Sequence, residues 1–260
     1  MQHMPIDRIA RMLAGCTGDT RVFPATDLYN EGWMLRLVLD WFASRPGIEH
    51  DLAFSADDRW YSEALLPTVF RPTKRPDPLA ESWTHADGAI GQFQIGAKGD
   101  GDLSLAPAAT RLVVTEAKMF SRLSSGVKNA SFFNQAARNV ACITELLNRA
   151  EINPAGMQRI GFFVTAPQSQ IESGVFSALL KKADIREIVA RRVAAYASNE
   201  KDQWFQEKFI PTLDHIRIGE ISWEGLVTLI TDHDPEFGAE LAGFYNKCLE
   251  FNRFVLRRFN

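Results

Sequence analysis

The stretch Leu112-Val113-Val114-Thr115-Glu116-Ala117-Lys118 decides how the rest of the chain is interpreted. Its apolar, β-branched first half is typical of a buried strand, which ends at a carboxylate and an ammonium two residues apart. Because side chains alternate along a strand, Glu116 and Lys118 are expected on the same face. This pair suits a site that binds a divalent metal ion and activates water, although an isolated Glu-x-Lys also occurs as an ordinary ion pair.

The composition is that of an ordinary soluble globular protein. The chain has 260 residues, of which 46% are hydrophobic and 23% are charged, enough to bury a sizeable core. No apolar run approaches the roughly 20 residues of a membrane span, and the N-terminus lacks the pattern of a signal peptide. Cys16, Cys142 and Cys248 lack metal-ligand spacing, which argues against structural zinc and favours a reduced compartment. We therefore expect a cytoplasmic protein with no membrane partner.

The charge is distributed unevenly along the chain. The net charge is only −3, yet the segment 117–144 contains no Asp or Glu, and its cations are Lys118, Arg122, Lys128 and Arg138. Serines and asparagines, Ser125 among them, fill the same segment. Cations and small hydrogen-bonding groups without competing anions suit contact with a phosphate backbone. The segment therefore predicts nucleic acid as a partner.

Hydrophobic patterning predicts an α/β sandwich with a mixed sheet. The expected helices cover the beginning of the chain, a region capped by Thr26 or Asp27 and running to Phe42, then 60–66, 132–150 and 171–210, and two final helices capped by Ser222 and Asp234. The expected strands cover 84–95, 103–105, 111–118, 160–164 and 216–221, and a turn covers 96–102. The antiparallel strands before Lys118 form a meander, and additional helices follow towards the C-terminus.

A metal site at Glu116 needs a second carboxylate, and two candidates exist. A hairpin centred between Gly101 and Asp102 would place Asp87 opposite Glu116, whereas one centred at Ala109 would place Asp102 there. Apolar residues follow Asp87, as expected at the mouth of a buried strand. Asp102 lies in a Gly-Asp-Gly-Asp turn, where aspartate is common for local reasons. We favour Asp87 and keep Asp102 as the alternative first acid.

These residues resemble the PD-(D/E)xK nuclease superfamily, which includes type II restriction endonucleases, Holliday-junction resolvases and many repair and defence nucleases. The resemblance rests on an aspartate at a strand start, Glu116-Ala117-Lys118 ending the next strand, and a basic loop and helix after it. The proline of the family name is absent, because Ala86 precedes Asp87. The resemblance implies a restriction-endonuclease-like core over about 26–166, with a helical and strand extension over about 167–260 in a single domain.

The resemblance also implies roles for individual residues. Asp87, or Asp102, and Glu116 would hold Mg²⁺ or Mn²⁺, and Lys118 would orient or deprotonate the attacking water. Glu31, on the first core helix, would add an outer-shell contact. Gln135 would face the site from the following helix. With it, the nucleic-acid-binding residues are Arg122, Ser125, Lys128 and Arg138.

Two functions follow from these expectations. The first is a metal-dependent DNA endonuclease of a restriction, repair or phage-defence kind, and the alternative is a non-catalytic nucleic-acid-binding module on the same scaffold. A homodimer is plausible, because cutting both strands with one site per chain is simplest in pairs. No P-loop or dinucleotide-binding motif is present, so no small-molecule organic cofactor is expected. His85 and Glu63 are expected to be structural, with Glu63 on a helix surface.

Overall fold

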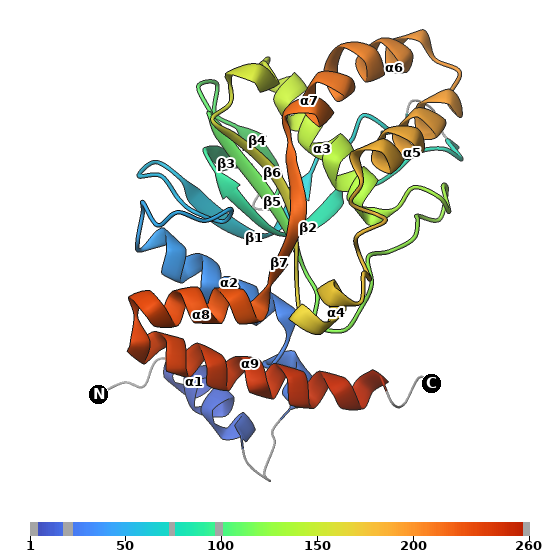
Figure 1. Cartoon of the computed structure of the whole chain (residues 1–260). Coiled ribbons are helices and arrows are strands. Elements are labelled where there is room, and N and C mark those ends of the chain that lie inside the picture. The colour runs from blue at the N-terminus through green and yellow to red at the C-terminus, as the bar shows by residue number, and fades with distance from the viewer. Residues whose placement is uncertain (1–4, 18–22, 73–75, 97–100, 257–260) are drawn as a thin grey trace.

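A mixed five-stranded sheet runs through the middle of the molecule, with helices on both faces (Figure 1). The structure is a computed structural model that describes residues 5–17, 23–72, 76–96 and 101–256. Its strands are β1 (Arg59–Leu66), β2 (Thr84–Gly91), β5 (Arg111–Ala117), β6 (Arg159–Ala166) and β7 (Arg217–Ser222), in the order β1-β2-β5-β6-β7. The first three pair antiparallel, and β5, β6 and β7 pair parallel. The expected α/β class and mixed sheet are confirmed.

The helices form two layers and enclose two apolar cores. They are α1 (Pro5–Ala14), α2 (Glu31–Ala43), α3 (Gln135–Arg149), α4 (Gln168–Glu172), α5 (Lys182–Ala194), α6 (Asn199–Trp204), α7 (Ile210–His215), α8 (Trp223–His233) and α9 (Pro235–Leu256). Val114 and Phe162 face the core beneath α3 and α5, whereas Val113 and Phe163 face the core beneath α2 and α8. This alternation is the period-two pattern of strands that are covered on both faces.

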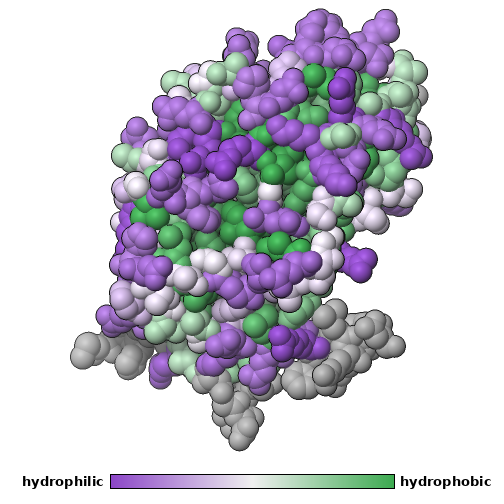
Figure 2. All heavy atoms as spheres, viewed as in Figure 1, coloured by the Kyte–Doolittle hydropathy of each residue, from purple (hydrophilic) through white to green (hydrophobic). Residues whose placement is uncertain are grey.

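The outer surface is mainly hydrophilic. Hydrophilic residues cover most of the face shown in Figure 2, and apolar residues are gathered towards its middle. In the described ranges, none of the helices combines the length and apolar character that a bilayer crossing requires.

The segment 60–66 is a strand, and the prediction of a helix there was wrong. It pairs with β2 along its length, from Arg59 opposite Gly91 to Leu66 opposite Thr84, so cross-strand pairing overrides the helix propensity of its Glu, Ala and Leu residues. Glu63 has a φ of 58°. Tyr61 and Ala64 both pack into the α3-side core, although an uninterrupted strand would place them on opposite faces. The alternation of β1 is therefore interrupted at Glu63.

The expected strand 84–95 is bent into two pieces at Gly91. Gly91 has a φ of 143°, and a Cβ there would lie 2.2 Å from the carbonyl oxygen of Arg111, so only glycine fits. After the bend, β3 (Phe93–Ile95) pairs with β4 (Leu103–Leu105) in a separate two-stranded sheet. Residues 97–100 of the expected turn lie outside the described residues.

The helix ends agree only in part with the sequence. Asn30, rather than Thr26 or Asp27, caps α2, because its side chain accepts a hydrogen bond from the backbone N–H of Trp33 at 3.0 Å. Ser222 and Asp234 accept from the backbone N–H groups of Gly225 and Phe237, as expected. The predicted helix over 171–210 is divided into several helices. The first of them, α4, ends shortly before Gly174, whose φ is 68°.

Candidate active site

The register of β2 and β5 brings Asp87 to Glu116. Gly88 pairs with Thr115 and Ile90 pairs with Val113, and the same register continued by one residue places Asp87 opposite Glu116. This is the register of a hairpin centred between Gly101 and Asp102. Beyond the last paired residue, the Asp87 carboxylate accepts a hydrogen bond from the backbone N–H of Ala117 at 2.7 Å.

Asp102, the alternative first acid, lies elsewhere. It forms an isolated bridge with Leu65 of β1, so β1 and β2 both stand between it and Glu116. Its carboxylate lies against Gly96, where an added Cβ would be 2.0 Å from the Asp102 Oδ1 atom. Asp87 is the aspartate that the fold places beside Glu116.

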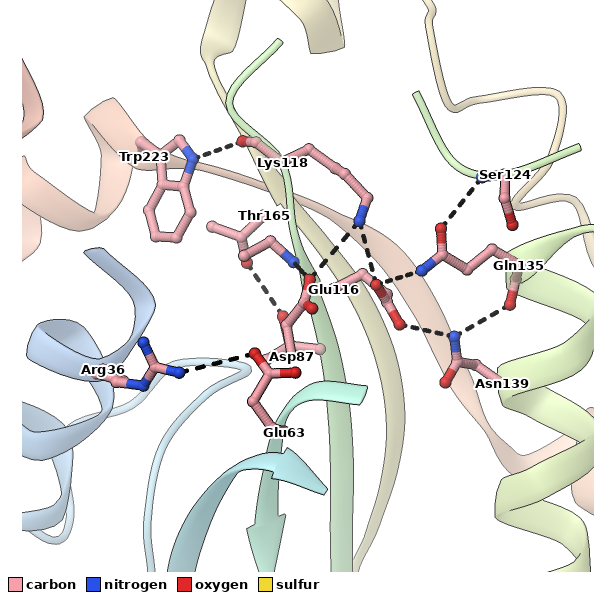
Figure 3. A network of polar contacts seen from close by, with 12 residues as sticks. Arg36, Glu63, Asp87, Glu116, Lys118, Ser124, Gln135, Asn139, Thr165 and Trp223 are labelled. Atoms are coloured by element: carbon pink, nitrogen blue, oxygen red, sulfur yellow. Dashed lines mark hydrogen bonds and ion pairs between the residues drawn. The ribbon is translucent and has the colours of Figure 1, made fainter. Parts of the chain in front are cut away.

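The Glu116 carboxylate is fully buried and is held by side chains from two elements. Its Oε1 atom accepts a hydrogen bond from Asn139 Nδ2 at 2.9 Å, and its Oε2 atom accepts from Gln135 Nε2 at 2.5 Å (Figure 3). Lys118 Nζ donates to the same Oε2 atom at 3.2 Å. Gln135 and Asn139 are one turn apart on α3, so they present their amides to Glu116 together.

Lys118 links the two carboxylates. Its Nζ atom lies 3.6 Å from Asp87 Oδ2 as well as 3.2 Å from Glu116 Oε2. The backbone N–H of Lys118 donates to the carbonyl of Thr165 at 2.8 Å, and its own carbonyl accepts from Trp223 Nε1 at 2.9 Å. The lysine is thereby fixed to β6 and α8 although it follows the last residue of β5.

Burial changes the protonation of this cluster. Desolvation, reinforced by the charge of Asp87, raises the pKa of Glu116 to about 8, against the opposing effect of Lys118 and Asn139. Burial lowers the pKa of Lys118, but the carboxylates of Glu116 and Asp87 outweigh this and raise it above its ordinary value. At neutral pH Lys118 is therefore a charged donor, and Glu116 binds a proton more readily than an exposed glutamate does.

A polar cavity of about 400 Å³ opens beside Asp87 and Lys118. Four acids line it, and we call them the acidic wall: Asp27, Glu31, Glu63 and Asp87. Trp33 and Arg36 also line the cavity, and the Arg36 guanidinium lies 3.7 Å from the Glu63 carboxylate. Glu31, which the resemblance assigned to an outer shell, faces the same space as Asp87.

The donors at this site fit a hard cation. Among the described residues, no group of three or more His, Cys, Asp or Glu side chains is placed to hold a metal ion. Mg²⁺ needs fewer, because it keeps several waters and is bound through one or two carboxylates. Asp87 and Glu116 offer oxygen donors that suit Mg²⁺ or Mn²⁺ better than zinc. The Oδ1 atom of Asn139 is also buried without a hydrogen-bond partner in the described structure, so it retains the capacity to accept one more hydrogen bond beside Glu116.

The expected nucleic-acid-binding residues lie on the segment that joins β5 to α3 and on α3 itself. Arg122, Ser125 and Lys128 are exposed, and Arg138 is half-buried. Gln135 faces Glu116, as the resemblance implies, and its Oε1 atom accepts from the backbone N–H of Ser124 at 3.1 Å. Gln135 thus connects this segment to the buried carboxylate.

Several residues of the site were missed at the sequence level. Asn139 is not among the site residues expected from the sequence, although its spacing of four from Gln135 is a signal that both share a helix face. Arg36 and Glu63 had no local signal, because their proximity depends on β1 being a strand. His85 is exposed and is not among the described residues that line the cavity.

Comparison with known proteins found no relative of this chain. No family model matches it, and neither a curated protein nor a solved structure matches it. The geometry of Asp87, Glu116 and Lys118 therefore carries the functional proposal.

Proposed function

We propose that this protein is a Mg²⁺-dependent deoxyribonuclease that hydrolyses phosphodiester bonds of DNA with Asp87, Glu116 and Lys118. One observation carries the proposal: a fully buried glutamate faces an aspartate on the neighbouring strand, and one lysine contacts both carboxylates. Two close carboxylates, of which Glu116 is buried and Asp87 is half-buried, repel each other without a cation, so such a cluster costs stability. A metal ion bound between the carboxylates would offset this cost.

The arrangement of the elements supports a core like that of the PD-(D/E)xK nucleases. Helix α2, the antiparallel strands β1, β2 and β5, helix α3 and the parallel strand β6 follow in the order helix, meander, helix, strand. This order is the one that the resemblance implies for residues 26–166. In this proposal, β7 and the helices α4 to α9 form the extension over about 167–260.

The chemistry of the residues agrees with this reaction. A phosphodiester resists attack because it is anionic, so hydrolysis needs positive charge on its oxygens and a nucleophile formed at neutral pH. Mg²⁺ bound by Asp87 and Glu116 would supply that charge and lower the pKa of bound water. Lys118 is charged, so it orients the water or stabilises developing negative charge, and it does not accept the proton. Gln135 and Asn139 fix the orientation of Glu116.

The substrate is inferred from the acid-free segment. Arg122 and Lys128 expose cations on the segment that leaves the site, and an anionic backbone binds such cations through counterion release. DNA is therefore the proposed substrate, and two copies of the chain would cut both strands of a duplex.

One observation favours the alternative of a non-catalytic nucleic-acid-binding module. Both oxygens of Glu116 already accept hydrogen bonds from protein groups, and Lys118 offsets the charge of the cluster. The site is thus satisfied without a metal ion, and the acid-free segment alone would hold nucleic acid.

Cleavage assays separate these functions. Supercoiled plasmid, linear duplex, single-stranded and branched DNA are incubated with the protein in Mg²⁺, Mn²⁺ or EDTA. We expect cleavage only with metal, loss of cleavage in Lys118→Ala and Glu116→Ala, and full cleavage in the control Lys208→Ala, an exposed lysine elsewhere. Circular dichroism verifies that each variant is folded. Binding of DNA without cleavage supports the alternative, and absence of both overturns both functions.

A further inference from the structure

A second cavity, of about 270 Å³, lies close to the proposed site. It is lined by Glu81 and Trp83 just before β2, by Thr84 at the first position of β2, and by Lys128 and Arg138 from the acid-free segment. Thr84 and Asp87 are on the same strand, about 10 Å apart along it. Arg138 is on α3, the helix that also carries Gln135 and Asn139. The cavity is thus within reach of a nucleotide that flanks the cleaved bond.

Glu81 is a buried carboxylate with one oxygen left unpaired. The residue is 8% exposed, and its Oε1 atom accepts from Arg192 Nε at 2.9 Å. Its Oε2 atom is buried and has no hydrogen-bond partner among the described residues. Leaving a buried carboxylate oxygen without a donor is costly. An N–H donor from a ligand would satisfy it.

The rest of the cavity offers a ring surface and cations. Trp83 is 38% exposed, and the guanidinium of Arg71 lies 4.2 Å from the centroid of its ring. Exposed tryptophans are the platforms on which proteins stack unpaired bases. The Nε atom of Arg138 is buried without a hydrogen-bond partner in the described structure, so it and the exposed Lys128 are donors for an acceptor group of the same ligand.

We propose that this cavity binds one unpaired guanine base of the nucleic acid strand, stacked on Trp83. The N–H edge of the base donates to Glu81 Oε2, and its O6 and N7 atoms accept from Lys128 and Arg138. Guanine is chosen because it offers N–H donors on one edge and two acceptors on another, and Arg or Lys is the usual partner of O6 and N7. Both edges are free only outside a duplex. This assignment rests on the proposed function, because it takes a nucleic acid strand as the ligand.

The test measures base preference without cleavage. Fluorescent oligothymidylates that carry thymine, guanine, inosine, adenine, cytosine or an abasic residue at one central position are titrated with Lys118→Ala in EDTA. We expect guanine to bind about tenfold more tightly than thymine and about fivefold more tightly than inosine, which lacks the amino group. Adding Glu81→Gln removes the guanine preference over inosine, because the amide presents a donor where the base needs an acceptor. Adding Trp83→Ala removes the advantage of guanine over the abasic residue.

Matched variants keep the test decisive. Trp33→Ala is the control, because Trp33 is 40% exposed and lies near an arginine but lines the other cavity; it should leave the guanine-to-inosine ratio unchanged. If Glu81→Gln unfolds through loss of the Arg192 pair, Trp83→Ala carries the test. Equal binding of all bases, or preference for another base, overturns the guanine assignment. Cleavage without guanine preference overturns only this pocket, and guanine preference without cleavage overturns only the nuclease.

Discussion

The two sides of Lys118 differ in charge. The acidic wall presents Asp27, Glu31, Glu63 and Asp87 to one cavity, whereas the segment 117–144, which follows in the chain, contains no acid at all. The net charge of −3 conceals this separation. A cation is attracted to one side and a phosphate to the other, so the boundary at Lys118 is where a metal ion and a phosphodiester would meet.

This separation also explains why the acidic wall does not exclude an anionic substrate in our proposal. Carboxylates alone repel phosphate, and the repulsion is removed when a divalent cation binds between them. The acid-free segment then holds the backbone in place.

The largest effect is expected at the boundary itself. Lys118→Ala removes the only side chain seen to contact both carboxylates within the described structure, and we expect the cleavage rate at saturating Mg²⁺ to fall about 10³-fold, as for loss of one preorganised electrostatic donor. Initial rates on a linear duplex measure this. A loss smaller than tenfold would place Lys118 outside the reaction.

The next effect is on stability and tests the burial of Glu116. Its pKa is about 8 in the folded protein and near 4.5 when unfolded, so between these values the folded state binds one more proton. The free energy of unfolding in EDTA should therefore fall by about 1.4 kcal/mol per pH unit as the pH rises from 5 towards 8, and level off above it. Urea unfolding of wild type and Glu116→Gln at several pH values isolates this difference. Parallel curves for the two proteins would contradict it.

A smaller effect is expected on the acidic wall. Glu31→Gln removes a charge from the cavity without touching Glu116 or Lys118, and the Mg²⁺ concentration for half-maximal cleavage should rise about tenfold, as for other outer-shell contacts. Glu49→Gln, an exposed acid outside the cavity lining, is the control. The comparison fails if both variants need the same amount of Mg²⁺.

The smallest effect is expected on the acid-free side. Arg122→Ala should weaken DNA binding a few-fold for every sequence and reduce the slope of log K against log salt by about 1, because it removes one phosphate contact. Fluorescence anisotropy at several salt concentrations measures the slope. Lys208→Ala serves again as the control, and an unchanged slope in Arg122→Ala would show that DNA does not lie over this segment.

Some of the site could be predicted because it depends on local periodicity. The run from Leu112 to Val114 specifies a buried strand, and a period of two then places Glu116 and Lys118 on one face. The acid-free segment is a matter of composition and needs no structure. Gln135 and Asn139 share a helix face for the same local reason, with a period of 3.6.

The rest depended on contacts between distant segments. The choice between Asp87 and Asp102 was open because both hairpins were compatible with the local pattern, and the bend at Gly91 sends β3 and β4 out of the sheet and leaves β2 beside β5. The helix propensity of 60–66 was overridden by pairing with β2, which is what brings Glu63 into the cavity.

The sequence by itself determined the strand that ends in Glu116 and Lys118 and the lack of acids after it, because alternation and composition are local properties. The tertiary structure decided that Asp87 faces Glu116, that Gln135 and Asn139 donate to it, and that four acids share one cavity. These depend on register and on packing between elements, which arise from the burial of whole faces and are not encoded at any single position.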